Sequence, residues 1–109
     1  MAWRYYEQSC IFNYDTEAVI NAVMLAAVQM GLNLKNDDRA ANRAEFSTGI
    51  SLTSWGQTVE TGWEVLPDGK IRVNVKSTSV YCLELASKSK NRNNVVEFVN
   101  ALNSLLPQK

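Results

Sequence analysis

Apolar and polar residues alternate most regularly between residues 58 and 77, and this alternation predicts an antiparallel β-hairpin. At its centre, Pro67-Asp68-Gly69 suits a three-residue loop that ends on a left-handed residue. Because that loop fixes the register, alternate residues share a face. One face is predicted to be core and to carry Val65, Trp63 and Thr61 opposite Ile71, Val73 and Val75. The other is predicted to be solvated and to carry Glu64 and Glu60 opposite Arg72 and Lys76.

Before the hairpin, the pattern predicts a strand, a helix and two further strands. The first strand covers residues 3–14, with Tyr6, Cys10 and Phe12 on one face. A helix is expected from Thr16 to Met30, because Asp15 suits its N-cap and Gly31 its end. Strands are predicted at residues 32–35 and 44–52, and the stretch between them, residues 36–43, fits either a solvated loop or a continuing strand.

The polar stripe of the first helix is thin, since only Glu17, Asn21 and Gln29 form it. A surface helix normally keeps a broad polar face. This helix is therefore expected to be enclosed by its own domain or buried against a partner chain. The second alternative makes the Asn21 face a candidate surface for oligomerisation.

After the hairpin, residues 80–85 are predicted to form a last strand, with a short helical turn as the alternative. Residues 87–94 are polar throughout and are interpreted as a loop. Asn94 and Glu97 then resemble a capping box before a helix that Pro107 ends. The fold class is accordingly α+β in the order β-α-β-β-β-β-α. We expect a curved antiparallel sheet of four or five strands with both helices on one face and the other face open.

Composition narrows the class of protein. The chain has 109 residues, 46% hydrophobic and 20% charged, which predicts a single folded domain over residues 1–109. The formal net charge is zero and no aromatic RNA-binding motif is present, so nucleic-acid binding is not expected.

The N-terminus lacks the order of a signal peptide, and the longest apolar run, residues 18–28, is shorter than the roughly 20 residues of a membrane span. We therefore expect a cytoplasmic protein without a membrane span.

Candidate chemistry is sparse. Histidine is absent, which excludes histidine bases and the commonest metal ligand. Cys10 and Cys82 have no metal-site spacing and are interpreted as buried free thiols, with a disulfide as the alternative. Asp37, Asp38 and Glu45 form an acidic cluster that fits a solvated loop with arginines nearby. We expect no catalytic site, no metal site and no cofactor, and hence no enzyme.

The sequence nevertheless contains two candidate binding sites. Lys88, Lys90, Arg92 and Asn94 lie where the predicted loop meets the last helix, so they are candidates for binding an anion. The alternative is an ordinary solvated loop in which Asn94 only caps the helix. A second candidate is an apolar pocket between the first helix and the sheet, near Trp63 and Tyr81.

Three short motifs carry a resemblance: Phe46 to Gly56 with its Ser-Trp-Gly turn, Val73-Asn-Val-Lys-Ser77, and the Lys/Asn segment before the last helix. In this order they resemble a group of small, largely uncharacterised bacterial α+β domains, over about residues 16–106. The resemblance implies a fold and a bacterial source. From all of these features we expect a non-enzymatic binding or assembly module that recognises itself, a protein partner or an anionic group. The alternative is a small-ligand carrier that uses the apolar pocket.

Overall fold

The computed structural model describes residues 5–48, 56–79 and 87–107, with the side chains of the last helix described from Lys90. Along the chain these residues form β1 (Tyr5–Phe12), α1 (Thr16–Gln29), β2 (Asn33–Asp38), a 3-10 turn η2 (Arg39–Ala41), β3 (Arg43–Ser47), β4 (Gln57–Val65), β5 (Ile71–Ser79) and α2 (Ser87–Leu105). This order confirms the predicted α+β class and the β-α-β-β-β-β-α sequence of elements.

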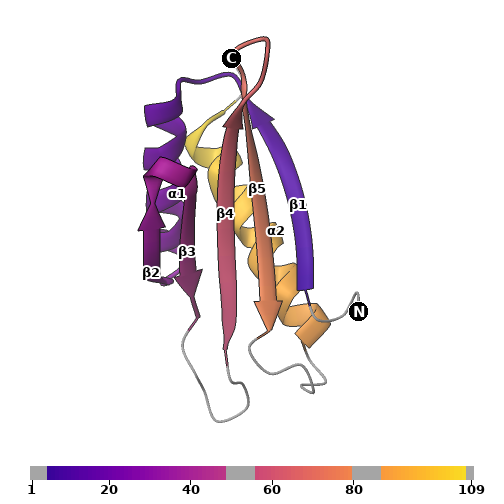
Figure 1. The fold of residues 1–109 in the computed structure, drawn as a ribbon. Coiled ribbons are helices and arrows are strands. Elements are labelled where there is room, and N and C mark those ends of the chain that lie inside the picture. The colour runs from indigo at the N-terminus through magenta and orange to yellow at the C-terminus, as the bar shows by residue number, and fades with distance from the viewer. Residues whose placement is uncertain (1–4, 49–55, 80–86, 108–109) are drawn as a thin grey trace.

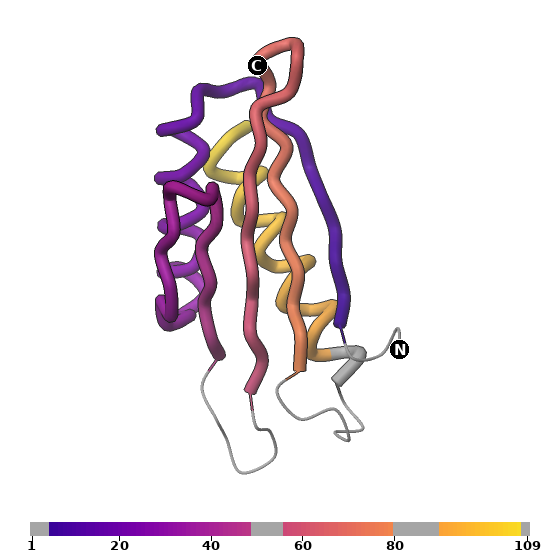
Figure 2. The backbone as a smooth tube through the Cα atoms, in the orientation of Figure 1, coloured from indigo at the N-terminus to yellow at the C-terminus, as the bar shows by residue number. Residues whose placement is uncertain are grey.

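The strands form one antiparallel sheet in the order β1-β5-β4-β3-β2. Both helices lie on the same side of this sheet, and its other face, here called the open face, is not covered by either helix (Figure 1). Figure 2 shows α2 running behind β5 and β1, while α1 lies behind β2 and β3. Strands β1 and β2 are therefore the two edges of the described sheet.

The central hairpin has the predicted register. Val65 pairs with Ile71 and Trp63 with Val73, and the loop closes through a 2.8 Å hydrogen bond from Leu66 N to Lys70 O. Gly69 has the predicted left-handed conformation, with φ +88°. One expectation is wrong: Val65 is 61% exposed, because β3 begins opposite Gly62 and leaves the end of β4 without that neighbour.

The core fills the space between the sheet and the two helices. Its buried apolar side chains come from every strand except β2 and from both helices: Phe12, Val19, Ala22, Val23, Ala26, Ala27, Ala44, Phe46, Val59, Trp63, Ile71, Val73, Val75, Val95, Phe98, Val99, Leu102 and Leu106. At its centre the rings of Phe46 and Phe98 pack with their centroids 6.1 Å apart. Trp63 is 4% exposed, as the register predicts.

Helix α1 begins and ends at the predicted signals. Asp15 Oδ1 accepts a 2.7 Å hydrogen bond from Ala18 N, and Gly31 takes φ +72° after the last turn. The outward face of α1 leaves Asn21 exposed, together with Leu25 (46%) and Val28 (71%). The described part of the chain thus does not enclose this helix.

Within the same described ranges, no helix has the length and apolar character needed to cross a membrane.

Helix α2 contradicts a prediction, because it begins at Ser87 and the polar segment 87–94 is helical, not a loop. Asn94 lies inside the helix and is not its N-cap. The physical reason is a buried polar contact: Asn91 is fully buried, accepts a 2.9 Å hydrogen bond from Ser77 Oγ and donates a 3.0 Å one to Ser79 Oγ. Polar residues on the helix thus match polar residues on the core face of β5.

The region between α1 and β3 combines both alternatives. Strand β2 continues to Asp38, η2 turns the chain, and Asn42 in the left-handed conformation (φ +58°) leads into β3. The expected last strand at residues 80–85, Tyr81, Cys82 and the end of the expected strand 44–52 lie outside the described residues.

Candidate functional site

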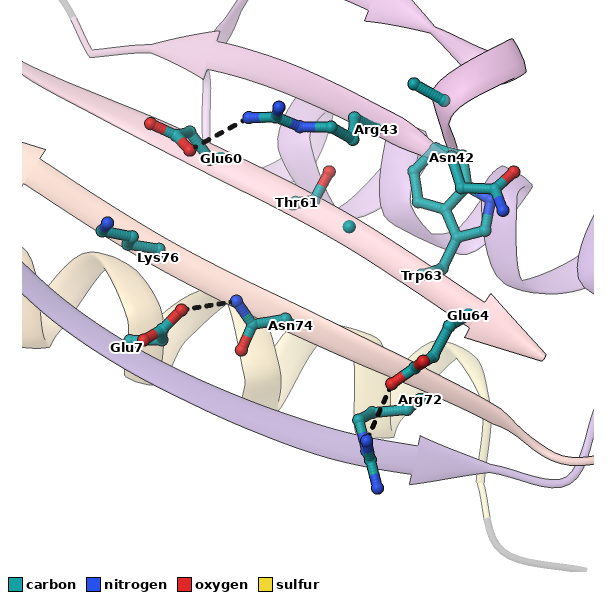
Figure 3. Close-up of a pocket in the computed structure, with 12 residues that line it drawn as sticks. Glu7, Asn42, Arg43, Glu60, Thr61, Trp63, Glu64, Arg72, Asn74 and Lys76 are labelled. Atoms are coloured by element: carbon teal, nitrogen blue, oxygen red, sulfur yellow. Dashed lines mark hydrogen bonds and ion pairs between the residues drawn. The ribbon is translucent and has the colours of Figure 1, made fainter. Parts of the chain in front are cut away.

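The open face of the sheet contains a hollow of about 420 Å³, here called the central hollow (Figure 3). Its floor is Gly62 of β4. Its walls come from four strands and from the turn before β3: Glu7 of β1, Asn42, Arg43 of β3, Glu60 and Glu64 of β4, and Arg72, Asn74 and Lys76 of β5. This volume lies within the range of small-molecule sites, roughly 300–1,000 Å³.

Gly62 creates the hollow by lacking a side chain. It alternates with Glu60 and Glu64 along β4, and it pairs with Arg43 on one side and Asn74 on the other. Its backbone conformation does not demand glycine: its φ is not positive, and an added Cβ would have its nearest neighbour, Asn42 O, at 3.7 Å. Glycine in a strand interior weakens the strand and often marks a close approach of a ligand or another backbone. Here its structural consequence is open space at the centre of the face.

Charged side chains of both signs surround this space. Arg43 Nη2 lies 3.3 Å from Glu60 Oε2, and Arg72 Nη1 lies 2.7 Å from Glu64 Oε1. Figure 3 shows these two pairs on opposite sides of the hollow. Both pairs are solvent-exposed, so each contributes about 0–1 kcal/mol to stability and is readily rearranged.

Three further polar side chains complete the rim along β1 and β5. Asn74 Nδ2 donates a 2.7 Å hydrogen bond to Glu7 Oε2. Lys76 pairs in register with Glu7 on one side and Glu60 on the other, and its Nζ lies 4.8 Å from the centre of the Tyr5 ring. The rim therefore holds three carboxylates and three cations, and it has no net charge.

Trp63 lines the end of the hollow next to Asn42, as Figure 3 shows. Its backbone N donates a 3.1 Å hydrogen bond to Asn42 O. Its indole Nε1 is buried and has no hydrogen-bond partner in the described part of the chain. A buried donor without a partner costs about 1–3 kcal/mol. The side chain lies on the core face of β4, so this donor is enclosed by the core.

The predicted site residues lie elsewhere. Lys88, Lys90 and Arg92 occupy the first turns of α2, which lies on the side of the sheet opposite the hollow. Asn94 donates to Ser77 Oγ at 3.1 Å and to Gln57 Oε1 at 3.4 Å, so it takes part in docking the helix. Anion binding by this segment stays a prediction.

The other predicted candidates are also separate from one another. Asn21 is on the outer face of α1, and an oligomer formed through it stays a prediction. Trp63 is among the residues that line the central hollow, while Tyr81 lies outside the described residues, so the apolar pocket between the first helix and the sheet stays a prediction. Asp37 and Asp38 are exposed as expected, but they lie on strand β2 and not in a loop. Asp37 Oδ2 lies 3.4 Å from Arg39 Nε.

Cys10 is a free thiol on β1, on the side that faces the helices. Partial burial raises the pKa of this thiol from 9.0 to about 11, since desolvation disfavours the thiolate. A thiolate nucleophile needs the opposite shift. The raised pKa is that expected of a structural thiol, while Cys82 lies outside the described residues.

Comparisons with known proteins identify a shared fold and no family. No protein-family model matches the chain, and no curated protein matches its sequence. The crystal structure of Ara h 8.0201 is 10% identical with a TM-score of 0.55, over 94% of this chain and 96% of that one. The crystal structure of TTHA0849 from Thermus thermophilus is 11% identical with a TM-score of 0.47, over the same shares of the two chains. At this identity the likeness to Ara h 8.0201 shows a common fold alone.

Proposed function

We propose that this protein is a non-enzymatic binding module that holds a small zwitterionic ligand in the central hollow. The observation that carries the proposal is the Gly62 floor, enclosed by carboxylates and cations in equal number. A ligand with one cationic and one anionic group, such as a free amino acid or a dipeptide, matches this rim. A ligand with a single sign of charge would meet like charges on at least one wall.

The exposed ion pairs explain how the rim would accept such a ligand. Glu60 and Glu64 would receive a ligand ammonium, while Arg43 and Arg72 would receive its carboxylate through their planar guanidinium groups. Each existing pair is partly solvated, so its exchange for a ligand group costs little. The same side chains are engaged with one another and not aimed at a common reacting atom, which supports binding without catalysis.

The polar side chain of Asn42 supports a specific orientation. Asn42 Nδ2 would donate to an acceptor at the η2 end of the hollow, where this exposed side chain lies. A peptide carbonyl or a second carboxylate oxygen fits this role. The proposal therefore favours a dipeptide over a bare amino acid, because a dipeptide supplies that additional acceptor.

The carrier alternative receives less support. Trp63 and its neighbours on the core face of β4, Val59 and Thr61, are buried among packed side chains. The likeness to Ara h 8.0201 concerns the fold and brings no ligand to this chain.

Isothermal titration calorimetry with defined probes tests the proposed function. The probes are Gly-Gly and L-glutamine as zwitterions, with inorganic phosphate and tetramethylammonium as ions of one sign. Gly62→Thr fills the floor with a residue that strands favour, and it should weaken zwitterion binding at least tenfold. Ser47→Thr, which adds one methyl group on the same face but outside the hollow lining, should leave binding unchanged. Binding of phosphate alone, or equal binding by Gly62→Thr, would contradict the proposal.

A further inference from the structure

The two edge strands of the sheet differ in their protection against strand pairing. β2 carries Lys35, Asp37 and Asp38 within six residues, and its register with β3 shifts between Leu34 and Asn36. Charges and such irregularities are the usual devices that keep an edge from pairing with another chain. The β2 edge is thus protected.

The β1 edge has none of these devices apart from one charge. Its eight residues pair continuously with β5 from Tyr5 to Phe12, without a register shift and without proline. Glu7 is its one charged residue. On its outer side no strand of the described sheet is paired with it. A long, regular and nearly uncharged edge is a template for strand addition.

Exposed apolar side chains stand near both ends of this edge. Tyr5 is 41% exposed and Ile11 is 53% exposed, and both project from the open face of the sheet, where they alternate with Glu7 and Ser9. Ile11 pairs with Arg72 of β5, so no apolar neighbour covers it from within its own sheet.

We propose that a second copy of this chain adds its β1 antiparallel to this edge, which joins two sheets into one about a two-fold axis. Directly opposed residues in antiparallel strands point to the same side. If both open faces lie on one side, odd-numbered residues must therefore oppose odd-numbered ones. Two registers satisfy this condition with the largest number of paired residues. In one, Gln8 of one copy lies opposite Gln8 of the other, and in the second, Ser9 lies opposite Ser9.

Side-chain complementarity selects the register centred on Gln8. In that register, Tyr5 of each copy lies opposite Ile11 of the other, so the interface contains two pairs of an aromatic and a β-branched residue. Glu7 of each copy lies opposite Ser9 of the other. In the register centred on Ser9, Glu7 would instead oppose Ile11. The edge is thus self-complementary, as an isologous two-fold interface requires. A formal net charge of zero adds no overall repulsion between copies.

Sedimentation equilibrium from about 1 μM to about 1 mM measures the association. The wild-type protein should form a dimer, and Ile11→Glu should raise its dissociation constant at least tenfold. The variant should fold, because Arg72 lies opposite the new carboxylate. Leu34→Glu is the matched control, since Leu34 is equally exposed at 55% on the other edge strand. It should leave the dimer intact.

Disulfide trapping tests the register without relying on a destabilising variant. In a background with both native cysteines replaced by serine, Gln8→Cys should cross-link the dimer under mild oxidation and Ser9→Cys should not. A protein that stays monomeric at every concentration would overturn the proposal. So would a dimer that responds to Leu34→Glu and not to Ile11→Glu, or one that cross-links through residue 9 and not residue 8.

Discussion

Replacement of Asn91 by leucine should strongly destabilise the fold, because this side chain joins the polar half of α2 to the sheet. It is fully buried and bonds to Ser77 Oγ and Ser79 Oγ at 2.9 and 3.0 Å. Leucine has a similar size but no polar atom, so both bonds are lost while the two hydroxyls stay buried. Ser77 keeps the hydrogen bond from Asn94 at 3.1 Å, so Ser79 bears more of the loss.

The magnitude follows from these contacts. Each lost neutral hydrogen bond removes about 1 kcal/mol, and a buried hydroxyl left without a partner costs about 1–3 kcal/mol. With Ser79 orphaned and Ser77 partly satisfied, Asn91→Leu should lower the free energy of unfolding by about 2–4 kcal/mol. For a domain of this size, that corresponds to a fall in Tm of about 10–25 °C.

Urea denaturation followed by circular dichroism measures this loss. Asn93→Leu is the matched control, since Asn93 lies on the same helix but is exposed, and it should change the unfolding free energy by less than about 0.5 kcal/mol. The triple variant Asn91→Leu/Ser77→Ala/Ser79→Ala should recover part of the loss, because it removes the orphaned hydroxyls as well. If Asn91→Leu lies within about 0.5 kcal/mol of wild type, the buried network does not hold α2 in place.

Three further predictions concern the hairpin, the free thiol and the rim. Gly69→Ala should lower the free energy of unfolding by about 1 kcal/mol, because alanine is strained at positive φ. Gly62→Ala should leave this free energy unchanged or raise it slightly. Equal losses of stability for the two variants in thermal unfolding would refute this contrast. Burial raises the pKa of Cys10 from 9.0 to about 11, so iodoacetamide should alkylate it ever faster between pH 9 and 11 in the Cys82→Ser variant. The stability that this raised pKa contributes is fully present below pH 9.0 and is lost as the pH rises toward 11. An alkylation rate that levels off near pH 9 in the folded protein would contradict the raised pKa. Glu64→Gln should change stability by less than about 1 kcal/mol but weaken dipeptide binding in calorimetry, and an unchanged affinity would remove Glu64 from the site.

The hairpin was predictable because its signals are local. Pro67, Asp68 and Gly69 fix the turn, and the turn fixes which residues of β4 and β5 face each other. The cap of α1 at Asp15 is local in the same way. Such features depend on a few neighbouring residues, so the sequence contains what is needed to infer them.

The start of α2 was not predictable from local signals. Residues 87–94 have the composition of a loop, and the described contacts of Asn91 and Asn94 with Ser77, Ser79 and Gln57 favour a helix there. These partners are 12 to 37 residues away in sequence. Tertiary contacts thus override local propensity here.

The central hollow was missed for a related reason. The sequence indicates that Glu60 and Glu64 face Arg72 and Lys76, but the approach of Arg43 depends on β3 lying next to β4. The one available signal was a glycine in the middle of a predicted strand, which often marks a close approach of a ligand or another backbone. Gly62 acquires meaning only once its charged neighbours are placed around it.

The most direct test of ligand binding in the central hollow is a residue-resolved NMR titration of ¹⁵N-labelled protein with Gly-Gly. Binding in the hollow should shift the backbone amides of Gly62 and Asn74 together with the side-chain amide of Asn74, and inorganic phosphate should not. Shifts confined to other residues, or no shifts at about 10 mM dipeptide, would show that this hollow does not hold a zwitterion.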